Sequence, residues 1–361
     1  MECLPIPQMS YSQFGERLNR RVLTERLPIS GSIELTFRCN LRCVHCYCNL
    51  PMNDPEAIEM ELGVDELYQI LDQIAEAGCL WLLITGGEPL LRNDFLDIYI
   101  YAKKKGFITT LFTNGTLLSP ELADALVEWP PFLVEITLYG ATKQTYESIT
   151  GIHGSFERCQ RGIDLLLERN LPLGLKTMAM KGNRAEIDQL KTYAAKRGVS
   201  FRFDPLVNPR LDGSKRPCNF RLSAEEVVAL DLNDEKRVKE WRELYEKSKG
   251  IFLDDSLFTC GAGISTFHID PYGRLGVCEM SRFKSFNLRR GSFGKGWSEF
   301  IPQVLALKAE GDPKCSSCEF IALCAQCPGW AWLENGDPGT LVDHLCEIVH
   351  IQAEAFDLKN S

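Results

Sequence analysis

The chain has 361 residues, of which 45% are hydrophobic and 25% charged, the composition of a folded globular protein with room for one large domain and a smaller one. Its net charge of −9 argues against a nucleic-acid backbone as the main partner, because binding phosphates requires an excess of Lys and Arg. No run of 18 apolar residues and no apolar stretch typical of a signal peptide is present, so we expect neither a membrane span nor export. Without export, 15 cysteines favour metal binding over disulfides, and we expect a reducing compartment, the cytoplasm.

Apolar segments alternate with amphipathic ones between residues 33 and 204. Leu67, Ile70, Leu71 and Ile74 recur at the spacing of one helix face, and Pro120 directly after Ser119 is typical of a helix start. In chain order we expect strands at Ile33–Thr36, Cys79–Thr85, Ile108–Phe112, Leu133–Leu138, Leu173–Met180 and Ser200–Asp204, and helices around Leu67–Ile74, at Phe95–Lys105, after Ser119, and at Phe156–Arg169 and Arg184–Arg197.

Six strand–helix units predict an α/β fold with a parallel sheet and right-handed crossovers. Six units are too few to close an eight-stranded barrel, so we expect a partial (β/α)6 TIM-type barrel over residues 31–205, with a lateral opening that suits a bulky substrate. Residues 1–30 would form an N-terminal extension, residues 206–255 a linker and helical segment, and residues 256–361 a small second domain.

The C-terminal part carries its own local signals. Ser223 with Glu226 predicts a capping box at the start of a charged helical segment, residues 224–249. Asp270-Pro271-Tyr272-Gly273 predicts a turn between two short strands. These strands are expected at Thr266–Ile269 and Leu275–Val277.

Three cysteines, Cys39, Cys43 and Cys46, follow the first predicted strand with the spacing Cys-x3-Cys-x2-Cys. Three thiolates in so short a loop can hold three irons of a [4Fe–4S] cluster and leave the fourth iron open to a substrate or cofactor. A structural zinc site that recruits His45 or Cys48 is the alternative. Zinc ligands usually come as two separated pairs, which favours the open cluster.

A second motif, Gly86-Gly87-Glu88-Pro89, follows the second predicted strand. Two glycines at a strand end permit positive φ and a close approach of the backbone to a ligand. Together with the cysteine triplet and the aromatic Tyr47 beside its third cysteine, this motif resembles the radical S-adenosylmethionine (SAM) superfamily.

The resemblance implies that SAM binds the open iron through its amino and carboxylate groups. One electron then cleaves SAM to methionine and a 5′-deoxyadenosyl radical, which takes a hydrogen atom from the substrate. The catalytic residues would be the three cysteines, and the backbone of Gly86 and Gly87 with the carboxylate of Glu88 would contact the SAM amino group. Tyr47 would also line the cofactor site.

Further SAM contacts are expected where barrel strands end. Thr113 and Asn114 follow the third strand, and Thr137, at the end of the fourth, would contact the ribose. Tyr139 replaces the Asp of many relatives at this strand end. Thr150 stands near the position where many relatives have an Arg, so the partner of the SAM carboxylate is in doubt. Lys176 is a candidate, with a lysine on the outside of the barrel as an equal alternative.

Arg202 and Asp204 alternate with aromatic residues in the last strand, which would turn both toward the barrel lumen. We expect a buried ion pair between them, with a substrate-positioning role for Asp204 as the alternative.

Seven more cysteines lie between residues 260 and 346. Their Cys-x2-Cys units occur in zinc and iron–sulfur sites alike, so spacing alone leaves both open. The array resembles the SPASM extension of peptide-modifying radical SAM enzymes, except that two residues rather than three separate Cys324 from Cys327. The resemblance implies two auxiliary [4Fe–4S] clusters, the first on Cys260, Cys278 and Cys327 and the second on Cys315, Cys318, Cys324 and Cys346. The first set lacks a fourth cysteine, for which Cys218 is a candidate.

Overall, the resemblance implies a radical SAM oxidoreductase that modifies a peptide or protein side chain, by C–C or C–S bond formation or by oxidation, as in the maturation of ribosomally made peptides. A flavodoxin- or ferredoxin-type donor would supply single electrons, and a separate leader-binding protein could deliver the peptide. Modification of a tetrapyrrole or other small molecule is the alternative. A non-catalytic iron–sulfur or zinc protein is a further alternative, against which the triplet with Gly86-Gly87-Glu88-Pro89 argues.

Overall fold

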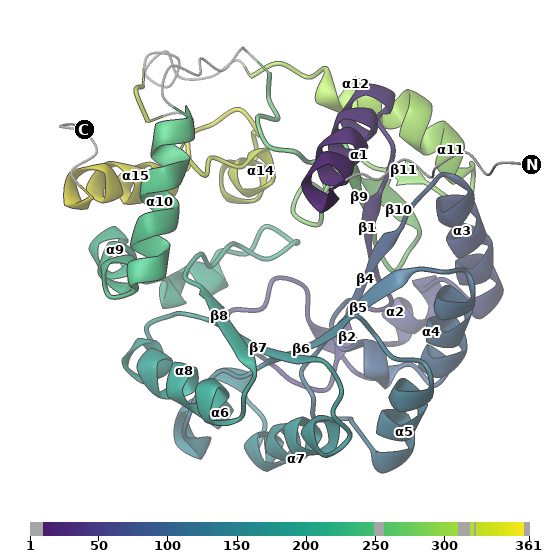
Figure 1. Ribbon diagram of the computed structural model, residues 1–361, viewed down its shortest axis with the longest axis horizontal. Helices are drawn as coiled ribbons and strands as arrows, with labels where there is room; N and C mark the ends of the chain where they lie inside the picture. The colour runs from purple at the N-terminus through teal and green to yellow at the C-terminus, as the bar shows by residue number, and fades with distance from the viewer. Residues whose placement is uncertain (1–9, 249–255, 310–317, 321–322, 357–361) are drawn as a thin grey trace, which may run out of the picture.

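The computed structural model describes residues 10–248, 256–309, 318–320 and 323–356 (Figure 1). One sheet dominates this part of the chain, with the strand order β11-β10-β9-β1-β4-β5-β6-β7-β8. Its strands are β1 (Ser30–Glu34), β4 (Trp81–Thr85), β5 (Ile108–Thr113), β6 (Leu133–Thr137), β7 (Leu173–Met178), β8 (Ser200–Asp204), β9 (Thr266–Ile269), β10 (Arg274–Gly276) and β11 (Phe286–Asn287). A small separate pair is formed by β2 (Arg38–Cys39) and β3 (Leu50–Pro51).

Helices surround the sheet on its outer side, as Figure 1 shows. Those of the barrel are α2 (Pro55–Met60), α3 (Val64–Glu76), α4 (Phe95–Lys104), α5 (Pro120–Glu128), α6 (Lys143–Thr150), α7 (Ser155–Glu168) and α8 (Ile187–Lys196), with α1 (Tyr11–Glu25) before β1. After the barrel come α9 (Ala224–Leu232), α10 (Glu235–Ser248), α11 (Phe293–Lys295), α12 (Ile301–Leu305), α14 (Pro328–Asn335) and α15 (Asp343–Ala355). Short 3-10 turns are η1 (Pro89–Leu91), η2 (Arg184–Glu186) and η3 (Arg216–Phe220), and Gly296–Phe300 forms a π-helical turn.

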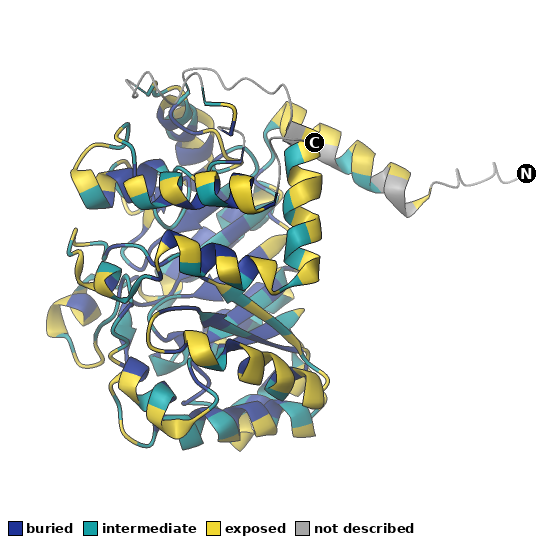
Figure 2. Ribbon diagram, turned by 90° about the vertical axis from the view of Figure 1, so that its left-hand side faces the viewer, coloured by how far each residue is buried: buried dark blue, intermediate teal, exposed yellow. Residues whose placement is uncertain are grey.

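The predicted partial barrel is confirmed. Strands β1, β4, β5, β6, β7 and β8 pair in parallel in sequence order, for example through Ser30 opposite Trp81. The apolar faces of the helices pack on the outside of this sheet: Leu67, Leu71 and Ile74 of α3 are almost completely buried. Figure 2 shows the buried strands between helices whose outer faces are exposed.

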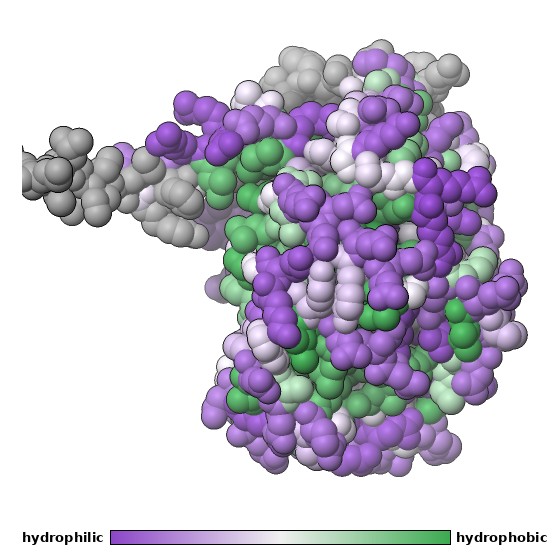
Figure 3. All heavy atoms as spheres, turned by 90° about the vertical axis from the view of Figure 1, so that its right-hand side faces the viewer, coloured by the Kyte–Doolittle hydropathy of each residue, from purple (hydrophilic) through white to green (hydrophobic). Residues whose placement is uncertain are grey.

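The outer surface follows the same amphipathic pattern. In Figure 3, hydrophilic side chains cover most of the side formed by the helices at the right of Figure 1, with smaller hydrophobic areas between them. In the ranges that the structure describes, no helix combines the length and apolar character needed to cross a bilayer.

Strand β9 pairs in parallel with β1, and β10 returns antiparallel to β9. The predicted turn is present, since Gly273 has φ of 78° and its N–H donates to the carbonyl oxygen of Asp270 at 3.1 Å. The C-terminal region therefore extends the barrel sheet on the side of β1, whereas β8 ends the sheet on the other side. The division into domains at residues 30, 205 and 255 stays a prediction.

Several local expectations needed correction. The charged segment after Ser223 begins with the predicted capping box, but it forms two helices rather than one. Asp234 accounts for the break, because its carboxylate accepts hydrogen bonds from the N–H groups of Lys236 and Arg237 and so starts a second helix. The expected helix at 184–197 opens with the η2 turn before α8.

Candidate active site

The cysteine loop is held from both sides by hydrogen bonds. Next to α6, the N–H groups of Arg42 and Val44 donate to carbonyl oxygens of Thr150 and Ile149 at 2.8 and 3.0 Å. From the segment after β8, Arg210 donates to the carbonyl oxygen of Cys46 at 3.1 Å and to Asn49. The sequence suggested only a linker at this arginine. The loop is thus fixed by the barrel and by the segment that follows it.

The three cysteines lie close together at this loop. Burial raises the pKa of the Cys39 thiol to about 12, and the mutual proximity of the three thiols adds to the increase at Cys43. A cavity of about 720 Å³ is lined by Cys39 and Cys43. Among the described residues, no three His, Cys, Asp or Glu side chains converge on one metal-ion position, as a tetrahedral zinc site would require. Three neighbouring thiols around an open cavity fit a cluster whose irons each take a different thiolate.

Hydrogen-bond donors face the sulfur atoms of the loop. Cys39 Sγ accepts from the Leu41 N–H at 3.4 Å and from Asn114 Nδ2 at 3.7 Å. Cys43 is hydrogen-bonded by the side chain of Tyr139, which lowers its pKa against the effect of burial. Cys48, which the sequence suggested only as an alternative zinc ligand, donates to Cys46 and is the main reason that the pKa of Cys46 falls to about 7. Such donors favour the thiolate form that binds iron.

Gly86 and Gly87 are required by a close approach of two backbone segments. Gly86 has φ of 141°, and a Cβ there would lie 2.4 Å from the carbonyl oxygen of Thr36. At Gly87 a Cβ would lie 2.3 Å from the carbonyl oxygen of Arg38. The Gly87 and Glu88 N–H groups donate to these same two oxygens at 2.6 and 2.9 Å. The two glycines therefore let the motif pack directly on the backbone segment that leads into Cys39. The contact of their backbone with a ligand stays a prediction.

Glu88 is completely buried and lies beside the third predicted strand end. Its carboxylate accepts hydrogen bonds from Thr113 Oγ1 at 2.7 Å, from the Asn114 N–H at 2.7 Å and from the Leu90 N–H at 3.1 Å. Burial raises its pKa to about 7, and no Lys or Arg in the described part of the chain forms an ion pair with it. A cationic ligand group, such as an ammonium, would stabilise this carboxylate in its ionised form.

The remaining predicted SAM contacts are spread over the lumen. Tyr47 donates its hydroxyl to Glu34 Oε1 at 2.9 Å. Thr137 ends β6 and is half-buried. Lys176 Nζ lies 3.6 Å from Glu135 Oε2, and burial lowers its pKa to about 7. Because the adjacent Leu175 is buried in the core, strand alternation turns Lys176 into the lumen rather than to the outside.

The predicted ion pair between Arg202 and Asp204 is wrong. Arg202 binds both carboxylate oxygens of Glu135, at 2.8 and 2.6 Å. Asp204 instead accepts the Leu206 N–H at 2.9 Å. A carboxylate on β6 can meet the guanidinium through two parallel hydrogen bonds, a geometry that Asp204, two residues away on the same strand, does not offer.

A buried charge network at β1 was not predicted. Glu34 is fully buried, and its Oε2 lies 3.1 Å from His268 Nε2 and 2.8 Å from Arg282 Nη2. Although burial opposes ionisation, Arg282 and His268 hold the pKa of Glu34 down to about 2. A charged residue between Ile33 and Leu35 was the only signal in the sequence, because its partners lie more than 230 positions away.

His45 was considered only as a zinc ligand. Its ring lies 4.8 Å from that of Tyr139, and its Nδ1 is buried without a hydrogen-bond partner in the described ranges.

The structure brings three of the C-terminal cysteines near one another. Cys260, Cys278 and Cys327 lie near enough to one another to raise the pKa of Cys278 and Cys327 beyond the effect of burial. In the second predicted set, Cys318 Sγ lies 4.0 Å from His350 Nε2, Cys324 and Cys346 are half-buried, and Cys315 lies outside the described residues. Cys218 lies in η3, where its charged neighbours are Arg221, Glu334 and Lys215.

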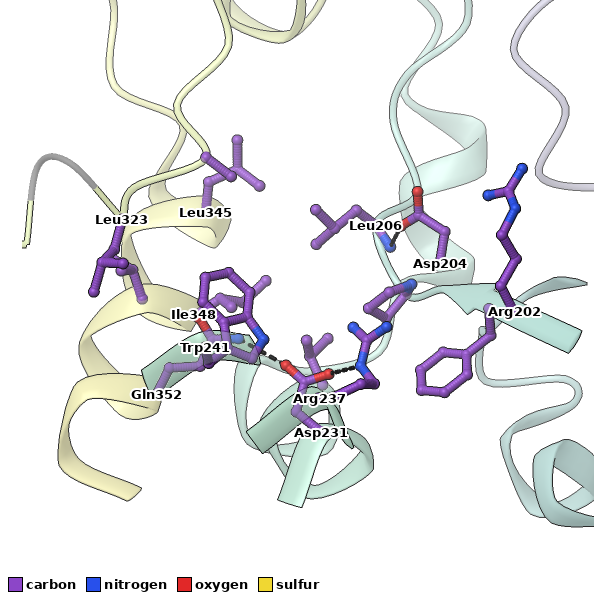
Figure 4. A pocket seen from close by; sticks show the side chains of 15 residues that line it. Arg202, Asp204, Leu206, Asp231, Arg237, Trp241, Leu323, Leu345, Ile348 and Gln352 are labelled. Atoms are coloured by element: carbon purple, nitrogen blue, oxygen red, sulfur yellow. Dashed lines mark hydrogen bonds and ion pairs between the residues drawn. The ribbon is translucent and has the colours of Figure 1, made fainter. Parts of the chain in front are cut away.

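A separate cavity of about 260 Å³ lies between β8 and the helices α9, α10 and α15 (Figure 4). Apolar side chains such as Trp241, Leu345 and Ile348 line it. Asp231 accepts hydrogen bonds from Arg237 at 2.6 Å and from Gln352 at 2.7 Å, and so ties α9 to α15. The cavity therefore lies between the last barrel strand and α15, the helix that contains Cys346.

Comparisons with known proteins agree with this site. The Radical SAM superfamily model matches residues 33–193. The Fe-coproporphyrin III synthase of Methanosarcina barkeri is 35% identical over 327 residues, which cover 80% of this chain and 80% of that protein. The mycofactocin maturase MftC of Mycobacterium tuberculosis is 28% identical over 342 residues, which cover 89% of this chain and 81% of that protein.

Solved structures show the same fold. Streptococcus suis SuiB bound to S-adenosylmethionine superposes with a TM-score of 0.70 at 16% identity, covering 94% of this chain and 84% of SuiB. SuiB bound to its precursor peptide SuiA gives the same TM-score. The family match over the barrel and the 35% identity along most of both chains show that this protein is an enzyme of the radical SAM superfamily, which works with a [4Fe–4S] cluster and SAM.

Proposed function

We propose that this enzyme modifies a peptide or protein side chain, with Cys39, Cys43 and Cys46 as ligands of the SAM-binding cluster. The observation that carries the proposal is the loop itself. Its three thiols are neighbours, and two of them, Cys39 and Cys43, line a cavity of about 720 Å³. The buried carboxylate of Glu88 nearby has no cationic partner in the described residues. The cluster and SAM together supply a hydrogen-abstracting radical when bound. Mycofactocin maturase and the SuiA-bound SuiB structure support a peptide as the substrate.

The residues around the loop would hold SAM in place. Glu88 would accept a hydrogen bond from the SAM amino group, helped by backbone carbonyls of Gly86 and Gly87. Thr113 and Asn114 fix the orientation of the Glu88 carboxylate through their hydrogen bonds. Lining roles for Tyr47 and Thr137, and a carboxylate-binding role for Lys176, complete the proposed site.

Two auxiliary [4Fe–4S] clusters are part of the proposal. The first would take Cys260, Cys278 and Cys327, which the fold brings near one another although they come from distant positions. The second would take Cys315, Cys318, Cys324 and Cys346. Among the described contacts of Cys218 none supports it as the missing ligand, since its charged neighbours are Arg221, Glu334 and Lys215.

The proposed partners follow from the chemistry. A flavodoxin- or ferredoxin-type protein would supply single electrons, and a leader-binding protein could present the peptide. We place the reaction in the cytoplasm, where thiols stay reduced.

The test is anaerobic reconstitution with iron and sulfide, followed by SAM and dithionite. We expect 5′-deoxyadenosine from the reconstituted protein and none from the Cys43→Ala variant. Product formation is then measured by mass spectrometry on candidate peptides encoded next to the gene. Absence of 5′-deoxyadenosine from a protein that carries the cluster would refute the proposal.

A second candidate substrate is a tetrapyrrole, favoured by the 35% identity to Fe-coproporphyrin III synthase. Incubation with coproporphyrin or its iron complex in place of a peptide distinguishes the two. A SAM-dependent change in the mass of the tetrapyrrole, with no change in any neighbouring peptide, would replace the peptide proposal.

A further inference from the structure

Two side chains from outside the cysteine loop donate hydrogen bonds to its sulfur atoms. Asn114 follows β5 and donates to Cys39. Tyr139 follows β6 and donates to Cys43. Both residues lie just after barrel strands, so their positions relative to the sulfur atoms depend on the barrel and not on the cysteine loop alone.

The orientation of the Asn114 amide is fixed by its other partners. Its Oδ1 accepts from the N–H and the hydroxyl of Thr116 at 2.9 and 2.6 Å. Its Nδ2 donates to Asn40 Oδ1 at 2.9 Å and to Cys39 Sγ at 3.7 Å. Since the amide oxygen already faces two donors, only the NH2 group can face the sulfur. Asn114 therefore presents a positive partial charge to Cys39.

Aromatic packing holds Tyr139 in place. Its ring lies 4.8 Å from the ring of His45 and 6.1 Å from that of Tyr146. A phenol hydroxyl beside a thiolate can only donate, because the thiolate carries no proton.

We propose that Asn114 and Tyr139 raise the reduction potential of the cluster held by Cys39, Cys43 and Cys46. The inference rests on the proposed function only in the assignment of these three ligands. A reduced cluster carries one more negative charge than an oxidised one, and hydrogen bonds to its sulfur atoms stabilise the more negative form. The two donors oppose the effect of the nearby Glu88 carboxylate, which disfavours added negative charge when it is ionised.

The experiment is a redox titration of the reconstituted protein without SAM, followed by electron paramagnetic resonance (EPR). The signal of the cluster on Cys39, Cys43 and Cys46 is the one that the Cys43→Ala variant lacks. Tyr139→Phe removes the hydroxyl and keeps the ring, and we expect a midpoint potential more negative than that of the unaltered protein. If the hydroxyl binds the reduced form up to tenfold more tightly, the shift is up to about 59 mV. Tyr146→Phe is the matched control, since it removes a hydroxyl from the same aromatic cluster and should leave the potential unchanged.

Asn114→Ala provides the second measurement and should also lower the potential. If this variant does not take up iron because Asn40 and Thr116 lose their partner, Tyr139→Phe alone decides. An unchanged potential in Tyr139→Phe, or an equal shift in Tyr146→Phe, overturns the inference. A missing [4Fe–4S] signal in the unaltered protein would instead overturn the proposed function, so the two failures are distinguishable.

Discussion

The thiols are brought together in different ways in two regions of the molecule, the cysteine loop after β1 and the C-terminal third. In the loop, three cysteines lie within eight residues, and neighbouring segments only hold the loop in place. In the C-terminal region, Cys260 precedes β9, Cys278 follows β10 and Cys327 precedes α14, and tertiary packing brings the three near one another. A short loop is specified by local sequence, whereas the second group depends on tertiary contacts.

The largest expected effect is on catalysis, and it differs between the two groups of cysteines. Cys43→Ala should abolish 5′-deoxyadenosine formation, because it removes one of the three proposed ligands of the SAM-binding cluster. Cys278→Ala should keep SAM cleavage and lose product formation, since it affects only the first auxiliary site. Each variant should lose about four iron atoms per chain, the content of one [4Fe–4S] cluster. Equal loss of SAM cleavage in both would show that the two regions do not act separately.

The next largest effect is on stability. It concerns the buried network in which Glu34 of β1 binds His268 and Arg282 of the C-terminal region. Glu34→Gln should destabilise the fold by about 3 kcal/mol at neutral pH, because the buried guanidinium of Arg282 loses the charge that compensates it. Urea unfolding of the apoprotein measures this value. The exposed pair of Arg21 with Glu25 is the control, and Glu25→Gln should change the free energy of unfolding by less than about 1 kcal/mol.

The same glutamate predicts a pH dependence. Its pKa is about 2 in the folded chain and 4.5 in the ordinary carboxyl, so its contribution is fully present above pH 4.5 and is lost as the pH falls toward 2. Between these values the unaltered protein should lose stability more steeply than Glu34→Gln. Parallel curves for the two proteins would mean that Glu34 is not the group that titrates.

A smaller effect is expected at the motif that supports the loop. Gly87→Ala should cost about 1–3 kcal/mol, because the new Cβ meets the carbonyl oxygen of Arg38 at 2.3 Å and pushes apart the segment that leads into Cys39. Gly294→Ala is the matched control, since no atom lies within 4 Å of its Cβ position. Thermal unfolding of both variants measures the difference, and equal melting temperatures would contradict the close approach.

The smallest expected effect on stability is at a local feature, the cap of helix α9, which lies between the two regions in the sequence. Ser223→Ala should lower stability by about 1 kcal/mol, through loss of the hydrogen bond to the Glu226 N–H at the start of α9. Ser223→Asp should restore most of the loss, because Asp also accepts this hydrogen bond. Loss of stability in both variants alike would assign the effect to packing.

The barrel strands and their helices were largely predictable. Periodic apolar residues such as Leu67, Leu71 and Ile74 marked the buried face of α3, and Ser119 with Pro120 marked the start of α5. Such signals extend over a few residues, and they can therefore be recognised in the sequence without knowing the tertiary contacts. The partners of Arg202 and Lys176 were not predictable, because strand alternation gives the face of a side chain but not which carboxylate across the sheet it meets.

The sequence by itself determined the superfamily, the six-stranded partial barrel and the cysteine loop. Each of them depends on the spacing of cysteines, motif residues or apolar residues over short stretches of the chain. Only the tertiary structure showed that Glu34 joins His268 and Arg282, that β9 extends the sheet beside β1, and that Asn114 and Tyr139 face the sulfur atoms of the loop. The physical reason is that hydrogen bonds and ion pairs between distant segments are chosen by geometry after packing. A charged residue in an apolar strand signals a partner, but packing alone selects it.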